Sequence, residues 1–234
     1  MYDPQSIIAL NELHRIRPSL VGGTIFTLGD LSVEIKGKDS IGNLVQEWLG
    51  AWFIDQGYNI TRGDRSQDYP DFYIGDTNQQ RLLEVKVFNA RNSPAFDIAN
   101  FEAYCTSLAR NPHRLLSDYL ILSYSITNHQ LQIENIWLKK IWEITGTSSD
   151  YPLKCQVKYR HRHTPNEIYN IENIRPITWY STNRTSVQPF QSREHFVDAL
   201  YNTQHTYRGH SNREEFNRNY DIWQNQNQNR MRGL

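Results

Sequence analysis

Two short segments carry charged side chains at a spacing that could bind a metal ion. Pro70-Asp71 is followed, after a gap of twelve residues, by Glu84-Val85-Lys86. Residues 71–75 and 81–88 each have the composition of a β-strand, and residues 75–80 (Gly-Asp-Thr-Asn-Gln-Gln) are turn formers. The sequence therefore predicts a hairpin that carries acidic residues on both of its strands.

The register of this hairpin decides whether its acidic residues meet. If paired residue numbers sum to 155, Ile74 lies opposite Arg81, and Asp71 lies opposite Glu84. Cross-strand neighbours have Cβ atoms about 4.5–5.5 Å apart, and two carboxylates so close repel each other unless a cation lies between them. Mg²⁺, which prefers oxygen ligands, fits such a gap, and the Val85 carbonyl could be a further ligand. A shift of one residue in register would separate the two carboxylates.

Alternation along the second strand places Glu84 and Lys86 on the same face. Charged groups between buried aliphatic residues require a reason, because the desolvation of a charge is costly. The Lys86 ammonium could orient a water molecule or stabilise charge developing on a phosphate. The face shared with Glu84 also holds Leu82 and Phe88, whereas the opposite, apolar face is expected to pack on the core and holds Leu83, Val85 and Val87.

The elements around the hairpin predict a mixed sheet flanked by helices. Residues 40–56 have the apolar spacing of a helix, and residues 58–62 follow as a strand. Beyond the hairpin, the pattern predicts a helix at 97–110, a buried strand at 119–126, and a strand followed by a helical turn at 131–144. The expected fold class is α/β, in the sense of an α+β protein with a central mixed sheet.

The motif and its setting resemble the PD-(D/E)xK nuclease superfamily. The resemblance covers residues 39–126, and the size of the chain is most similar to that of type II restriction endonucleases. It implies a nuclease that uses Mg²⁺ to hydrolyse double-stranded DNA at a short specific sequence. It further implies that Asp71 and Glu84 are metal ligands and that Lys86 is the third catalytic residue.

The same resemblance implies two further features. Many members of the superfamily add an acidic residue from the first helix, and the matching position here is Gln46 or Glu47. Glu47 keeps the carboxylate and is taken as the additional ligand, although both residues lie on flanks of the apolar stripe. Segments 133–146 and 169–179 also resemble enzymes that cut the sequence GGNNCC.

A second Glu-x-Lys triplet, Glu34-Ile35-Lys36, lies nearer the N-terminus. It has no Pro-Asp strand at a suitable spacing upstream, and it precedes the long helix instead of following it. We therefore expect it to be unrelated to the active site.

The charge distribution points to a DNA-binding surface in the second half of the chain. The net charge is zero, but residues 1–149 hold 13 Lys and Arg against 17 Asp and Glu, and residues 150–234 hold 12 against 8. Strand-like alternation gives residues 154–162 one basic face that could contact phosphates or guanine, or could equally be a solvated strand face. The candidate DNA-binding residues on this face and just beyond it are Lys154, Lys158, Arg160, Arg162, Arg175 and Arg184.

Composition limits where the protein works and how it is divided. The 234 residues include two cysteines, no apolar run of transmembrane length and no secretory signal, which favours the reducing cytoplasm. We expect one nuclease domain over residues 1–202, with the common core at 39–126 and a DNA-recognition elaboration at 127–202. A short helix is predicted at 193–202, and a frayed polar tail at 203–234.

The expected partners follow from the substrate. Because a duplex has two strands, a two-fold symmetric site is most simply cut by a homodimer. The resemblance also implies a cognate DNA methyltransferase, as a genetic partner and not as a stable complex, and no membrane partner is expected. Two alternatives remain: a structure-specific repair or recombination nuclease with the same fold, and a non-catalytic DNA-binding module.

Overall fold

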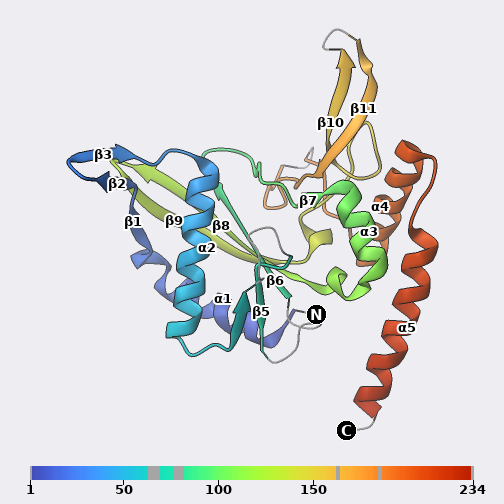
Figure 1. Ribbon diagram of the computed structural model, residues 1–234, viewed down its shortest axis with the longest axis horizontal. Coiled ribbons are helices and arrows are strands. Elements are labelled where there is room, and N and C mark those ends of the chain that lie inside the picture. The colour runs from blue at the N-terminus through green and yellow to red at the C-terminus, as the bar shows by residue number, and fades with distance from the viewer. Residues whose placement is uncertain (1, 63–68, 76–81, 162–163, 184–185, 233–234) are drawn as a thin grey trace. The chain divides into compact units, whose positions relative to one another are not determined.

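The structure is a computed structural model that describes residues 2–62, 69–75, 82–161, 164–183 and 186–232 (Figure 1). The chain forms two compact units, one made of residues 1–96 and 116–140, the other of residues 97–115 and 141–234. These limits differ from the predicted sequence boundaries, because the second unit takes residues 97–115 from within the predicted core. None of the helices in the described ranges combines the length and apolar character needed to cross a membrane.

The first unit is built on a six-stranded sheet with the order β1-β9-β8-β6-β5-β4. β6 and β8 are parallel and the other neighbours are antiparallel, so the sheet is mixed, as predicted. The unit also contains helix α1 (Pro4–Ile16), the 3₁₀ turn η1 (Arg17–Ser19) and helix α2 (Lys38–Asp55). The six strands are β1 (Val21–Gly23), β4 (Ile60–Arg62), β5 (Phe72–Ile74), β6 (Leu82–Asn89), β8 (Asp118–Thr127) and β9 (Gln130–Lys139).

The core of this unit lies between one face of the sheet and the helices α1 and α2. Leu13 of α1 and Leu49 and Phe53 of α2 are fully buried in it. From β6 the core takes Leu83 and Val85, with Val87 packed against it, which confirms the predicted apolar face of this strand. Helix 40–56 is confirmed as α2. Phe88 lies outside this core and stacks on Trp137.

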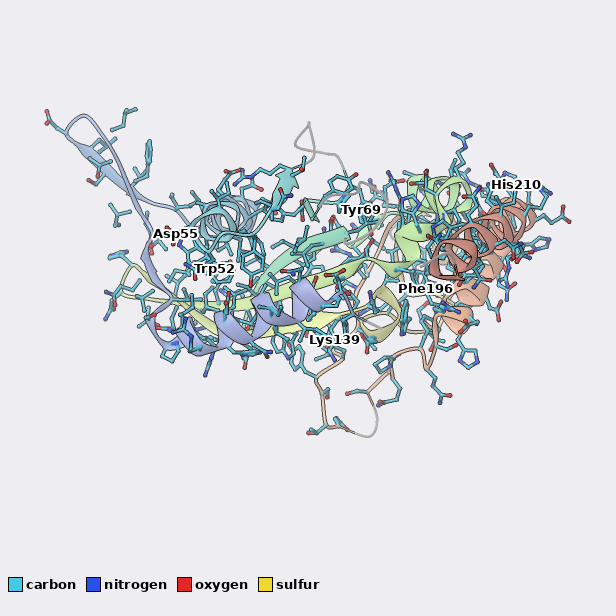
Figure 2. All side chains as sticks on the ribbon, turned by 90° about the horizontal axis from the view of Figure 1, so that it is seen from below. Trp52, Asp55, Tyr69, Lys139, Phe196 and His210 are labelled. Atoms are coloured by element: carbon cyan, nitrogen blue, oxygen red, sulfur yellow. The ribbon has the colours of Figure 1, made fainter. Side chains whose placement is uncertain are left out.

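A separate hairpin joins β1 to α2. Its strands, β2 (Ile25–Leu28) and β3 (Leu31–Glu34), form a two-stranded sheet of their own. Figure 2 shows this hairpin extending away from the six-stranded sheet, at the upper left. Neither this hairpin nor α1 was predicted from the sequence.

The second unit combines a three-stranded antiparallel sheet, of order β10-β11-β7, with helices. The strands are β7 (Ala99–Asn100), β10 (Cys155–His161) and β11 (Thr164–Ile174). The helical elements are α3 (Phe101–Arg110), η2 (Pro112–Leu116), η3 (Ile141–Glu143), α4 (Arg193–Arg208) and α5 (Arg213–Arg232). The predicted helix at 97–110 is thus shorter, because residues 99–100 pair with β11 before it begins.

The prediction of a frayed tail from residue 203 is wrong. Helix α4 continues to Arg208 and ends at Gly209, which has the positive φ of a helix C-cap, and α5 then runs to Arg232. Asn and Gln have modest helix propensity. The stripe formed by Phe216, Tyr220 and Trp223 gives α5 an aromatic face, however, and neighbouring rings of this stripe contact one another.

Candidate active site

The β5–β6 hairpin has the predicted register. Phe72 pairs with Leu83 and Tyr73 with Leu82, so paired residue numbers sum to 155. Arg81, the expected partner of Ile74, lies outside the described residues. Continued by one residue, this register places Asp71 opposite Glu84, and the Asp71 N–H donates to Glu84 Oε2 at 3.3 Å. The Glu84 carboxylate therefore lies beside Asp71, close enough to affect the charge of its carboxyl group.

Both oxygens of the Asp71 carboxylate accept a hydrogen bond. The Val85 N–H donates to Oδ2 and the Gln46 side-chain amide donates to Oδ1, each at 2.7 Å. Burial, reinforced by the nearby Glu84 carboxylate, raises the pKa of Asp71 to about 7 against the opposing effects of Val85, Lys86 and Gln46. The fold thus holds this carboxyl in one orientation and disfavours its charge.

Glu84 and Lys86 lie two residues apart on the same face of β6. The Lys86 Nζ is 2.9 Å from Glu84 Oε1, and only 6% of Glu84 is exposed. Glu84 is thus in contact with both Asp71 and Lys86. The structure brings the three predicted catalytic residues into one cluster at the start of β6.

The expected place of Glu47 at the metal site is wrong. Glu47 points to solvent and pairs with Arg62, its Oε2 lying 2.5 Å from Arg62 Nη1. Gln46 is the residue of α2 that reaches Asp71. Consecutive helical residues differ by about 100° around the axis, so one of two neighbouring polar positions must turn away from the sheet.

The donor set of this site fits a hard divalent cation. Within the described residues no group of three or more Asp, Glu, His or Cys side chains could hold a metal. Mg²⁺ does not require three such side chains, because it is usually bound by one or two carboxylates and keeps several water ligands. Asp71, Glu84 and the carbonyl of Val85 supply such a set. A cation there would also relieve the repulsion that raises the pKa of Asp71.

The other Glu-x-Lys triplet has a structural role. Glu34 ends β3, where its carboxylate lies 2.9 Å from Lys36 Nζ and 3.1 Å from His129 Nδ1. Hydrogen bonds from these two residues lower the pKa of Glu34. The triplet holds the base of the β2–β3 hairpin, as expected for a motif unrelated to catalysis.

The six predicted DNA-binding residues all belong to the second unit. The pairing of β10 with β11 shifts its register three times between Cys155 and His161, and the extra residues at these shifts lie in β11. Three of the basic residues contact neighbours: Lys154 donates to the Pro176 carbonyl, Lys158 pairs with Glu172, and Arg175 pairs with Asp97. The side chain of Arg160, and residues Arg162 and Arg184, lie outside what the structure describes.

Comparison with known proteins assigns this chain to a family. The family model described as "NgoBV restriction endonuclease" matches residues 5–232. The chain belongs to the NgoBV restriction endonuclease family. A curated relative, the type II restriction enzyme NlaIV of Neisseria lactamica, is 38% identical over 180 residues, which are 76% of this chain and 70% of that protein.

Two further similarities support the assignment to this restriction endonuclease family. The type II restriction enzyme NgoBV of Neisseria gonorrhoeae is 34% identical over 134 residues, which are 57% of this chain and 77% of that enzyme. The solved structure of the NlaIV restriction endonuclease superimposes with a TM-score of 0.81 at 32% identity, covering 96% of this chain and 90% of the other. The chain is therefore a type II restriction endonuclease, a DNA-cleaving hydrolase of a class that uses divalent metal, which confirms the predicted fold and activity.

Proposed function

We propose that this restriction endonuclease uses Mg²⁺ held by Asp71, Glu84 and the Val85 carbonyl. The observation that carries the proposal is the contact between the two acidic residues at the start of β6, with Lys86 beside them. Bound Mg²⁺ supplies a Lewis acid that activates a water molecule and stabilises charge on the scissile phosphate.

The chain's own residues have distinct tasks in this proposal. Gln46 and the Val85 N–H fix the orientation of Asp71 through their hydrogen bonds. Glu84 holds Lys86 so that its ammonium can orient the attacking water and stabilise the developing negative charge. The buried setting strengthens these interactions because it lowers the local dielectric.

DNA recognition is assigned to the second unit. Lys158, Arg160, Arg162 and Arg184 are proposed as phosphate or base contacts, because their sequence region is basic. Lys154 and Arg175 instead support the local structure, since they bind Pro176 and Asp97. The resemblance of segments 133–146 and 169–179 to enzymes that cut GGNNCC makes that sequence the proposed target.

The proposed enzyme acts as a homodimer, with one Asp71–Glu84–Lys86 centre for each DNA strand. It works in the cytoplasm, alongside a cognate DNA methyltransferase that protects the same sequence and forms no stable complex with it.

One digest tests the proposed metal requirement and the proposed target sequence. Unmethylated plasmid or phage DNA is incubated with the protein and either Mg²⁺ or chelator, and the fragment ends are sequenced. Discrete fragments with ends in GGNNCC, formed only with metal, are expected. Fragments ending in another sequence would overturn the proposed target alone, whereas cleavage in chelator would overturn the metal site.

A further inference from the structure

The β2–β3 hairpin exposes one wholly apolar face. The antiparallel register pairs Phe26 with Val33 and Leu28 with Leu31, so these four side chains lie on the same face. They are between 48% and 75% exposed. The opposite face is more polar, with Thr27 hydrogen-bonded to Ser32 at 2.8 Å.

Hydrogen bonds and ion pairs anchor the base of this hairpin, although its strands are exposed to solvent. The Thr24 N–H donates to the His129 carbonyl at 3.0 Å, and the Ile35 N–H donates to the Thr24 carbonyl at 2.7 Å. Glu34 adds its pairs with Lys36 and His129. An isolated two-stranded hairpin is at best marginally stable in water, and an exposed apolar patch marks a contact surface. The hairpin therefore has the properties of a preformed arm.

The same unit contains an apolar groove beside β1, the strand that leads into the arm. It has a volume of about 280 Å³, and Leu20, Val21, Leu44, Trp48 and Leu131 are among its lining residues. Leu44 and Trp48 are 50% and 40% exposed. Gly22 and Gly23 also line the groove, and each has open space where a Cβ would lie.

We propose that the arm of each protomer packs its Phe26, Leu28, Leu31 and Val33 face into the groove of a second copy. When two copies are related by a two-fold axis, the arm of each can bind the groove of the other. Both arms and both grooves are then occupied, so the assembly stops at a dimer. The proposal rests on the homodimer of the proposed function and assigns its interface.

The exposed area matches what such a dimer needs. Seven large apolar side chains of the arm face and the groove, each 40–75% exposed, offer roughly 100 Å² apiece, or about 700 Å² per protomer, which is close to the usual contribution of one partner to a stable interface. The seven residues are Val21, Phe26, Leu28, Leu31, Val33, Leu44 and Trp48.

Charge favours a second copy over DNA as the occupant. The charged residues of segment 25–34 are Asp30, at its turn, and Glu34, which pairs with Lys36 and His129. Asp30 at the tip would repel a phosphate backbone, whereas the apolar groove of a second copy brings no such repulsion.

Sedimentation with a short GGNNCC duplex tests the interface. The proteins compared are the wild type, Leu28→Asp and the matched control Thr27→Asp. Leu28→Asp should raise the dimer dissociation constant about 100-fold or more, because it buries a charge, whereas Thr27→Asp, on the polar face, should change it less than about threefold. Unchanged melting temperatures would show that both variants fold.

Cross-linking distinguishes the possible failures. Mixed Leu28→Cys and Leu44→Cys chains, separately tagged, should form a disulfide that contains both tags, and wild-type mixtures should not. A wild-type dimer that survives Leu28→Asp and gives no mixed disulfide would overturn this interface but leave the dimer standing. A wild-type monomer on the duplex would overturn the dimer itself, and with it this interface.

Discussion

The chain contains the pattern Glu-x-Lys twice, and the two copies differ in what surrounds them. In both Glu34-Ile35-Lys36 and Glu84-Val85-Lys86, the lysine Nζ lies 2.9 Å from its glutamate. The first pair is more open, with 77% of the Lys36 side chain exposed against 19% for Lys86. An ion pair alone therefore does not identify an active site.

The neighbours of each glutamate make the difference. Glu34 has Lys36 and His129 beside it, which favour its charge, so its pKa is lowered. Glu84 has a second carboxylate beside it, and burial with this neighbour raises the pKa of Asp71. The first environment satisfies a carboxylate, whereas the second leaves negative charge that a cation can neutralise.

The largest expected difference in cleavage rate comes from replacing the glutamate of each triplet in turn. Glu84→Ala should reduce cleavage at least about 1,000-fold and leave DNA affinity largely unchanged, because its carboxylate binds the cation and not the DNA. Glu34→Ala should stay within a few-fold of wild type. Plasmid digestion and gel-shift assays measure both. A Glu84→Ala protein that cuts within about tenfold of wild type would remove Glu84 from the metal site.

Replacing each lysine should change the cleavage rate in the same order as replacing each glutamate, but by a smaller factor. Lys86→Ala should lower the cleavage rate about 100-fold, since it removes one charge that stabilises the developing phosphate charge. Lys36→Ala should change this rate less than about twofold, because its charge supports the arm. Single-turnover cleavage at saturating protein measures both rates. Equal losses in the two variants would contradict the distinction between the triplets.

The basic region should show the reverse of the Glu84 result, a loss of binding without a loss of chemistry. Neutralising Lys158 and Arg160 should weaken DNA binding and reduce the salt slope by roughly 0.9 for each phosphate that the protein no longer neutralises. Lys158 pairs with Glu172, which moderates its contribution. Binding titrations over a salt series measure the slope, and an unchanged slope would place the DNA surface elsewhere.

The smallest effect is on stability, and its sign differs between the two sites. The fold raises the pKa of Asp71 from an ordinary value of 3.8 to about 7, so the metal-free protein should lose stability as pH rises from about 4 to about 7. Asp71→Asn should abolish this loss and melt several degrees higher than wild type at pH 8 in chelator. The lowered pKa of Glu34 contributes stability above its ordinary value of 4.5 that is lost as pH falls.

Thermal melts of wild type, Asp71→Asn and Glu34→Gln between pH 4 and 9 check these signs. Glu34→Gln should lower the melting temperature slightly at neutral pH and not at low pH. If Asp71→Asn melted below wild type at pH 8 in chelator, the carboxylate pair would not be a source of repulsion.

The active-site hairpin was predictable because local rules determine it. Turn formers and strand alternation set the register of β5 and β6, and the pairs that sum to 155 confirm it. The choice between Gln46 and Glu47 was not predictable, because both lie beside the apolar stripe of α2. The hydrogen bond from Gln46 to Asp71, and the pair that Glu47 forms with Arg62 of β4, show which of them faces the site.

Long-range packing explains what the sequence did not predict. Helix α1 buries Ala9 and Leu13 on the sheet but has exposed Ile7 and Ile8 elsewhere, which blurs its apolar stripe. The register shifts between β10 and β11, whose extra residues lie in β11, were likewise not predicted. Helix α5 packs on other helices through Phe216, whose ring contacts Tyr201 of α4, and through Asn219, whose amide donates to the Ala109 carbonyl.

Helix α2 would link the proposed dimer interface mechanically to the proposed active site. Gln46, which orients Asp71, and Trp48, which lines the groove proposed for the partner's arm, are separated along the helix axis by about 3 Å. A continuous helix transmits a shift at one position to the other with little loss. A partner bound against Trp48 would therefore restrain the helix that orients the Asp71 carboxylate. A protomer without its partner would then hold this carboxylate less rigidly than a protomer in the dimer.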